Sequence, residues 1–122
     1  MNFLAIDYGT KRIGLAYSVS GVISTLPPVS NNSELIANLK KVIANYHIDK
    51  VYIGVSEGDF ADITRLFVDK LRPLLSIDIE TVEESVSTIE ADAIYKANRN
   101  KAKNYKQTID SIAAAVILRR VL

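Results

Sequence analysis

The chain has 122 residues, 48% of them hydrophobic and 24% charged, and its net charge of +1 excludes a polycation. This size and composition are typical of one globular domain over residues 1–122. The sequence has no Cys and a single His, which excludes disulfides and thiolate metal sites and disfavours a histidine zinc site. The apolar run at the N-terminus ends at Asp7, too early for a signal peptide or a membrane span. We therefore expect a cytoplasmic protein without membrane association.

The first part of the chain alternates between apolar runs and short turns, which predicts three strands joined by hairpins. Residues 2–7 and 12–18 read as the first two strands. A third run, 22–26, ends at two consecutive prolines, Pro27 and Pro28. Since proline cannot donate to a central ladder, we expect the chain to leave the sheet at this point.

Helical spacing replaces this pattern after residue 30. Asn31 and Glu34 have the spacing of a capping box, and apolar residues then recur with helical periodicity up to Tyr46. A short apolar strand over 51–55 and a second helix, capped by Asp59, follow. The predicted apolar stripe of that second helix is Ile63, Leu66, Phe67 and Leu71.

The last third of the chain predicts one more strand and two helices. Residues 77–82 alternate apolar with polar, Ser87 begins a second capping box, and Thr108 begins the last helix. Three hairpin-connected strands followed by alternating helices and strands predict an α/β fold, a mixed five-stranded sheet flanked by helices on both faces. The predicted stripe of the last helix is Ile109, Ile112, Ala113, Val116 and Ile117.

Three acidic residues stand where composition does not explain them. Asp7 ends the first strand, Glu84 follows the fifth strand, and Asp110 lies in the first turn of the last helix. In this element order the first, fourth and fifth strands can be neighbours, so we expect the three carboxylates to converge. The alanines at 113–115 allow the last helix to approach the sheet and bring Asp110 towards Asp7.

A cluster of three carboxylates needs a shared proton or a cation. Two unit charges 4 Å apart cost about 4 kcal/mol at an effective dielectric of about 20. Oxygen ligands without Cys or His select Mg²⁺ or Mn²⁺, and a pair of such ions is the usual apparatus of phosphodiester cleavage. We therefore interpret Asp7, Glu84 and Asp110 as metal-binding and catalytic residues. Taken singly, Glu84 could be a solvated acid and Asp110 could complement a helix dipole.

Charges are unevenly distributed in the last third of the chain. Residues 78–92 contain six acids and no base, and residues 96–106 contain five bases and no acid. These stretches are either solvated faces or a cation-binding region beside a phosphate-binding segment. For the second alternative, the expected nucleic-acid-binding residues are Thr10, Lys11, Arg12, Lys101, Lys103 and Lys106.

Residues 7–16, Asp-Tyr-Gly-Thr-Lys-Arg-Ile-Gly-Leu-Ala, resemble the opening signature of the YqgF family, bacterial proteins similar to Holliday junction resolvases. Residues 51–54, 82–88 and 109–114 resemble further motifs of the family, in the same order and over nearly the whole chain. The resemblance implies an RNase H-like nuclease domain over 1–122, with metal-binding acids at Asp7, Glu84 and Asp110. It also implies a bacterial cytoplasmic protein that acts in maturation of the 5′ end of the 16S ribosomal RNA precursor.

The sequence departs from the family's pattern at two places that bear on activity. Ser85 stands where the family usually has Arg, and the residues after Gly54 replace its usual Leu-Pro and Asn/Asp-rich loop. Glu83 replaces the family's Asp and keeps its charge.

Four hypotheses follow. The leading one is a nuclease for ribosomal RNA precursor, with RNA favoured over DNA and a pre-ribosomal particle as a candidate partner. The second is a DNA junction resolvase, which needs a dimer; we expect a monomer or a weak homodimer. The third is a catalytically weak nucleic-acid-binding module on the same fold. The least favoured is a sugar-kinase or actin-like phosphate-binding turn, because those folds need two such domains and a second glycine-rich loop.

Overall fold

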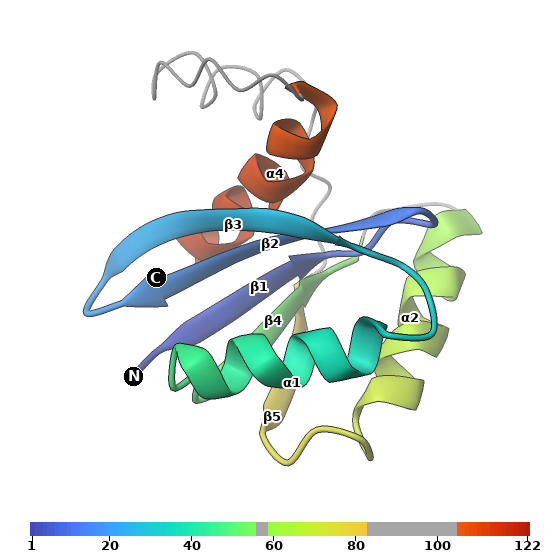
Figure 1. Ribbon diagram of the computed structural model, residues 1–122, viewed down its shortest axis with the longest axis horizontal. Helices are drawn as coiled ribbons and strands as arrows, with labels where there is room; N and C mark the ends of the chain where they lie inside the picture. Colours follow the sequence, from blue (N-terminus) through green and yellow to red (C-terminus); the bar gives the residue numbers. More distant parts are fainter. Residues whose placement is uncertain (56–58, 83–104) are drawn as a thin grey trace.

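In the part of the chain that the structure describes, a central five-stranded sheet carries two helices on one face and one on the other (Figure 1). The computed structural model describes residues 1–55, 59–82 and 105–122, with side chains except at 59 and 105–110. The strand order is β3-β2-β1-β4-β5. The first three strands pair antiparallel, and β4 and β5 run parallel to β1. This confirms the predicted mixed sheet flanked by helices. The bounds are β1 Phe3–Asp7, β2 Arg12–Val19, β3 Val22–Ser30, α1 Leu35–Asn45, β4 Lys50–Gly54, α2 Asp59–Leu71, β5 Asp78–Val82 and α4 Tyr105–Val121.

The two faces of the sheet carry side chains of different size, and this sets how closely the helices approach. Large residues such as Leu4 and Ile6 of β1 point to the face covered by α1 and α2. Ala5, between them, points to the other face and packs with Ala114 of α4 in a second cluster. The small side chains on both sides let α4 lie close to the sheet, as the alanine run predicted.

The predicted end of the third strand is wrong. β3 continues through Pro27 and Pro28 to Ser30. It is an edge strand of the described sheet, so the missing proline N–H groups remove no bond from a central ladder. Opposite the prolines, the register of β3 with β2 shifts between Ile13 and Leu15. The two strands pair on either side of this bulge.

The predicted capping box of the first helix is also wrong. Helix α1 begins at Leu35, and Glu34 occupies the N-cap without a side-chain hydrogen bond. The Asn32 side chain accepts a hydrogen bond from the Glu34 amide at 2.9 Å instead. Asn31 lies further back and binds a different part of the chain.

The predicted apolar stripe of the second helix is only partly buried. Phe67 and Leu71 are buried as predicted, but Ile63 is 46% exposed and Leu66 is 69% exposed. The buried face passes through Thr64 and Val68. Ile63 and Leu66 instead border a groove between α1 and α2. Helical spacing alone could not distinguish the apolar residues that face the core from those that border the groove.

The remaining boundaries agree with the sequence to within a few residues. The strands predicted over 51–55 and 77–82 occupy 50–54 and 78–82. The last helix begins at Tyr105 rather than Thr108, so the prediction that Asp110 lies in its first turn is wrong, and its residues 111–118 are all buried. The helix predicted from Ser87 lies outside the described residues. None of the described helices is both long and apolar enough to cross a membrane.

Candidate active site at the end of the central strand

Asp7 ends the central strand with a glycine beside it on each neighbouring strand. Its register partners are Gly14 on β2 and Gly54 on β4. Alternation along β1 puts Asp7 on the same face as Ala5, the face covered by α4. Neither neighbouring strand therefore puts a side chain beside Asp7, which is half-buried, and Ile117 of α4 occupies the space next to Gly54.

Helix α4 is fixed against the sheet at two points. A Cβ atom on Gly54 would lie 2.5 Å from Cδ1 of Ile117, so the helix touches the sheet where a side chain is missing. Near the other end of the described helix, the Ser111 hydroxyl donates a 2.6 Å hydrogen bond to the Leu26 carbonyl of β3. These contacts set the path of α4 across the sheet, and Asp110 directly precedes Ser111 on it.

The three predicted acids come from elements that the fold brings together to different extents. Asp7, Gly54 and Val82 form one row across β1, β4 and β5. This confirms that the first, fourth and fifth strands are neighbours. Glu84 lies outside the described residues, two positions after Val82 in the sequence. The backbone of Asp110 belongs to α4, which packs on β1, but its side chain is not described. The convergence of the three carboxylates therefore stays a prediction.

The environment of Asp7 fits a hard divalent cation. Asp7 provides oxygen donors only, and glycines flank it on the same face. Within the described side chains, no three Asp, Glu, His or Cys residues gather into a metal-binding group. A complete ligand set at Asp7 would therefore need side chains outside the described ones.

The turn after Asp7 is tight and is held by Asn31, which the sequence pattern predicts in the capping box of the first helix. A Cβ atom on Gly9 would collide with the Arg12 carbonyl oxygen. The Asn31 backbone amide donates to the Lys11 carbonyl at 2.9 Å. The Asn31 side-chain amide donates to the Gly9 carbonyl at 2.9 Å and to the Tyr8 hydroxyl at 3.1 Å. No sequence signal marked these bonds, because they depend on the register of β2 with β3.

A stack of aromatic rings anchors the same turn from the opposite face of the sheet. The Tyr8 ring lies 4.2 Å from the Phe67 ring and 6.1 Å from the Phe60 ring, centroid to centroid. Both phenylalanines belong to α2. Thr10 and Lys11 of the turn are exposed, and Arg12 is half-buried. The predicted nucleic-acid-binding residues Lys101, Lys103 and Lys106 lie outside the described residues.

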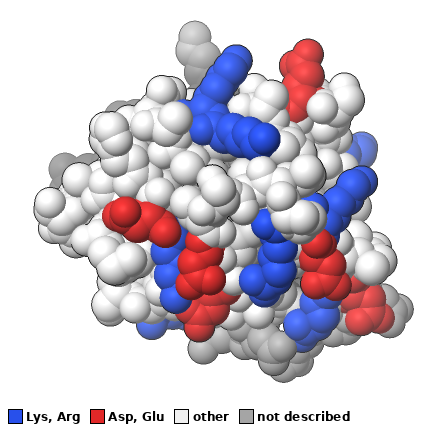
Figure 2. Space-filling model, turned by 90° about the horizontal axis from the view of Figure 1, so that it is seen from below, with Lys and Arg blue, Asp and Glu red and all other residues white. Residues whose placement is uncertain are grey.

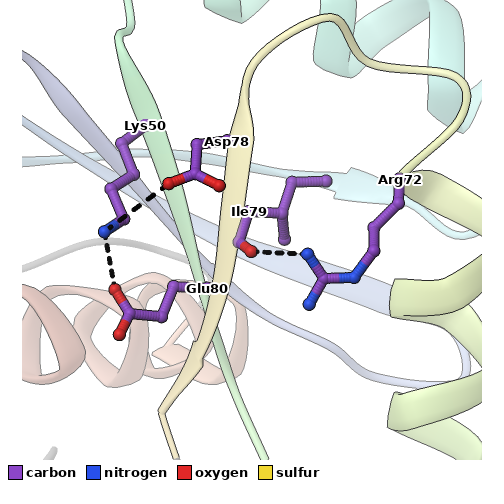
Figure 3. A network of polar contacts seen from close by, with 5 residues as sticks. All are labelled: Lys50, Arg72, Asp78, Ile79 and Glu80. Atoms are coloured by element: carbon purple, nitrogen blue, oxygen red, sulfur yellow. Dashed lines mark hydrogen bonds and ion pairs between the residues drawn. The ribbon is translucent and has the colours of Figure 1, made fainter.

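A separate polar network lies at the other end of the parallel strands (Figure 3). Lys50 Nζ is 2.6 Å from the Glu80 carboxylate and 3.8 Å from the Asp78 carboxylate. The hydrogen bond to Glu80 raises the pKa of Lys50 above its ordinary value of 10.5. Arg72 donates a 2.7 Å hydrogen bond to the Ile79 carbonyl of β5. Because Lys50 pairs with Phe3, at the start of β1, this network lies away from Asp7 and is structural.

The face seen from below Figure 1 has mixed charge. In the lower half of Figure 2, acidic and basic side chains lie next to one another. Lys50, at the start of β4, is neutralised by its ion pairs with Asp78 and Glu80 of β5. A nucleic acid binds best to an uninterrupted basic surface. The mixed charge of the described part of this face therefore does not favour nucleic-acid binding there.

This chain is similar to known proteins over nearly its whole length. A protein from Sulfurihydrogenibium sp. (strain YO3AOP1) named "Putative pre-16S rRNA nuclease" is 34% identical over 130 residues, covering 98% of this chain and 88% of its own length. A protein of the same name from Bacillus cereus (strain B4264) is 28% identical over 134 residues, covering 100% of this chain and 98% of its own.

The fold is shared with a solved resolvase. The structure of T. thermophilus RuvC in complex with a Holliday junction substrate has a TM-score of 0.62 at 11% identity, covering 99% of this chain and 96% of RuvC. This likeness confirms the predicted RNase H-like fold. The family model described as RuvX, Holliday junction resolvase, matches residues 1–122, and the chain belongs to this family, also called YqgF.

Proposed function

We propose that this protein is a divalent-metal-dependent nuclease that hydrolyses phosphodiester bonds in the maturation of the 5′ end of the 16S ribosomal RNA precursor. The observation that carries the proposal is the position of Asp7, at the end of the central strand and flanked by two glycines on the α4 face. Family membership and the names of the relatives supply the reaction class and the RNA.

Asp7, Glu84 and Asp110 are the proposed ligands for Mg²⁺ or Mn²⁺. Neighbouring strands are about 4.8 Å apart, so Val82 stands about 10 Å from Asp7 across the sheet. Glu84 follows Val82 by two residues in the sequence. A metal held by these residues would supply the activation of water and the stabilisation of the leaving oxygen. Asp7 contributes by holding its carboxylate on a strand bonded on both sides.

The nucleic acid is proposed to lie along the turn after Asp7 and the basic segment further along the chain. Thr10, Lys11 and Arg12 would bind its phosphates beside Asp7, and Lys101, Lys103 and Lys106 would extend the contact. The proposal comprises one domain over 1–122, acting in the cytoplasm on RNA or on a pre-ribosomal particle, as a monomer or a weak homodimer.

The test is cleavage of a 5′-extended 16S precursor fragment in Mg²⁺ or Mn²⁺. We expect cleavage to stop with EDTA and Asp7→Asn to lower kcat about a hundredfold or more, because that is the usual scale for losing a group that acts in the transition state. Asp69→Asn, an exposed carboxylate on α2, is the matched control and should keep wild-type activity. Cleavage that survives Asp7→Asn would contradict the proposed site.

A second candidate is resolution of four-way DNA junctions. The likeness to RuvC bound to its junction favours it at the level of the fold. We would assay a labelled four-way junction beside the RNA, together with the mass of the protein in solution. Paired cleavage of the junction by a dimer would favour the resolvase. Binding of both nucleic acids without cleavage would favour the catalytically weak module, consistent with Ser85 in place of Arg.

A further inference from the structure

We propose that Asn31 is a positioning residue for nucleic-acid binding, which holds the turn at residues 8–11 so that Thr10 and Lys11 meet the phosphate backbone beside Asp7. The inference rests on the proposed nuclease function and extends it to a residue remote in sequence. Asn31 follows the last residue of β3, and Ser30 pairs with Arg12. The register of a long hairpin therefore brings Asn31 to the turn.

The side-chain amide of Asn31 is suited to this role because it donates two hydrogen bonds at once. One goes to the Gly9 carbonyl at 2.9 Å and the other to the Tyr8 hydroxyl at 3.1 Å. Its backbone amide adds a third bond, to the Lys11 carbonyl at 2.9 Å. An aspartate has the same shape but no amide hydrogens, so it cannot hold the Gly9 carbonyl.

The held side of the turn faces the protein, and the other side is exposed. Tyr8 is stacked on Phe67, whereas Thr10 and Lys11 are exposed. A turn that is already ordered presents these two groups without further loss of conformational freedom on binding. Loss of the Asn31 hydrogen bonds would leave the side chains of Thr10 and Lys11 unchanged but would misplace them relative to the phosphates. The expected loss is therefore in affinity, with the metal site untouched.

The experiment measures the affinity for a fluorescein-labelled 16S precursor fragment by anisotropy, in an Asp7→Asn background that prevents cleavage. We expect Asn31→Asp to raise Kd about three- to tenfold, the scale of one net hydrogen bond. Asn32→Asp is the matched control because it adds the same charge one residue away. Its carboxylate can still accept the bond from the Glu34 amide. We expect it to change Kd less than about twofold.

A double-mutant cycle separates positioning from a general loss of structure. If Asn31 acts through the turn, Asn31→Asp and Lys11→Gln together should raise Kd by less than the product of the single effects. Amide chemical shifts of Thr10 and Lys11 should move in Asn31→Asp and stay in Asn32→Asp. Tyr8→Phe removes only one acceptor of the Asn31 amide and keeps the stacked ring, so it should raise Kd about twofold. This variant replaces Asn31→Asp in the experiment if Asn31→Asp does not fold.

The outcomes distinguish this inference from the proposed function. If the wild type cleaves RNA but Asn31→Asp binds as tightly as Asn32→Asp, the positioning role is wrong and the nuclease stands. Multiplicative effects of Asn31→Asp and Lys11→Gln overturn the positioning role as well. A wild-type protein that neither binds nor cleaves any nucleic acid overturns both.

Discussion

At the scale of single residues, Gly54 is constrained by packing beside the candidate site. It lies next to Asp7 in the sheet, and Ile117 of α4 fills the space that a side chain would take. The missing side chain at Gly54 thus lets Ile117, and with it α4, lie close to the sheet beside Asp7. Residues of this kind read as ordinary strand residues in a sequence, because the constraint comes from a helix more than sixty residues away.

Gly54→Ala tests this constraint. The added methyl group would lie 2.5 Å from Cδ1 at the flexible end of Ile117, which can shift, so we expect a loss of about 1 kcal/mol in the free energy of unfolding, the low end of overpacking. Ile117→Val removes that Cδ1 atom and alone should cost about 0.5–1.5 kcal/mol. Urea unfolding of the two single variants and the double variant gives the coupling. A double variant that shows the simple sum of both losses would contradict the contact.

At the scale of elements, the two ends of the parallel strands have different roles. The carboxyl ends carry Asp7 and the row to Val82, and the other ends carry the ion pairs of Lys50. β5 is an edge of the described sheet, and Arg72 donates to its Ile79 carbonyl. This bond, together with the charged Asp78 and Glu80, discourages pairing with another chain.

The Lys50–Glu80 pair predicts a pH effect with a definite sign. The pKa of Lys50 in the folded protein is raised above 10.5, chiefly by the hydrogen bond to Glu80. The pair therefore stabilises the fold below pH 10.5, and this contribution is lost as the pH rises through the raised pKa. Glu80→Gln should lower the pKa of Lys50 towards 10.5, as followed by the Lys50 Cε chemical shift.

Asp78→Asn is the comparison for this measurement. Its carboxylate is 3.8 Å from Lys50 Nζ, against 2.6 Å for Glu80, so its effect on the pKa should be smaller. An equal or larger effect of Asp78→Asn would show that the hydrogen bond to Glu80 is not the main cause. High salt should reduce both effects because the carboxylates are exposed.

At the scale of the whole molecule, binding of metal should stabilise the fold, because three distant segments would be linked through one site. For a ligand that binds only the folded state, a concentration a hundred times Kd adds about 2.7 kcal/mol. We expect Mn²⁺ to raise the Tm of the wild type by several degrees and to leave Asp7→Asn almost unchanged. Asp69→Asn should respond like the wild type. An equal rise in Asp7→Asn would place the metal elsewhere.

The alternation of strands and helices was readable from the sequence because each element keeps its own hydrophobic period. Residues 1–19, for example, contain the first two strands, the turn and Asp7 in the order that the structure shows. The match to the family's motifs added the RNase H-like fold, which the comparison with RuvC confirms. Glu84 and Asp110 as partners of Asp7 remain predictions on chain order and motif alone.

The sequence by itself determined the sheet's composition, the order of its elements and the placement of Asp7 at a strand end, since these depend on local patterns. Only the tertiary structure decided that Pro27 and Pro28 stay within an edge strand, that Asn31 binds the turn after Asp7, and that Ile63 and Leu66 border a groove instead of the core. Each of these three features depends on which other segment of the chain packs beside it. Strand register and helix orientation are set by contacts between residues far apart in the chain, which local sequence patterns do not record.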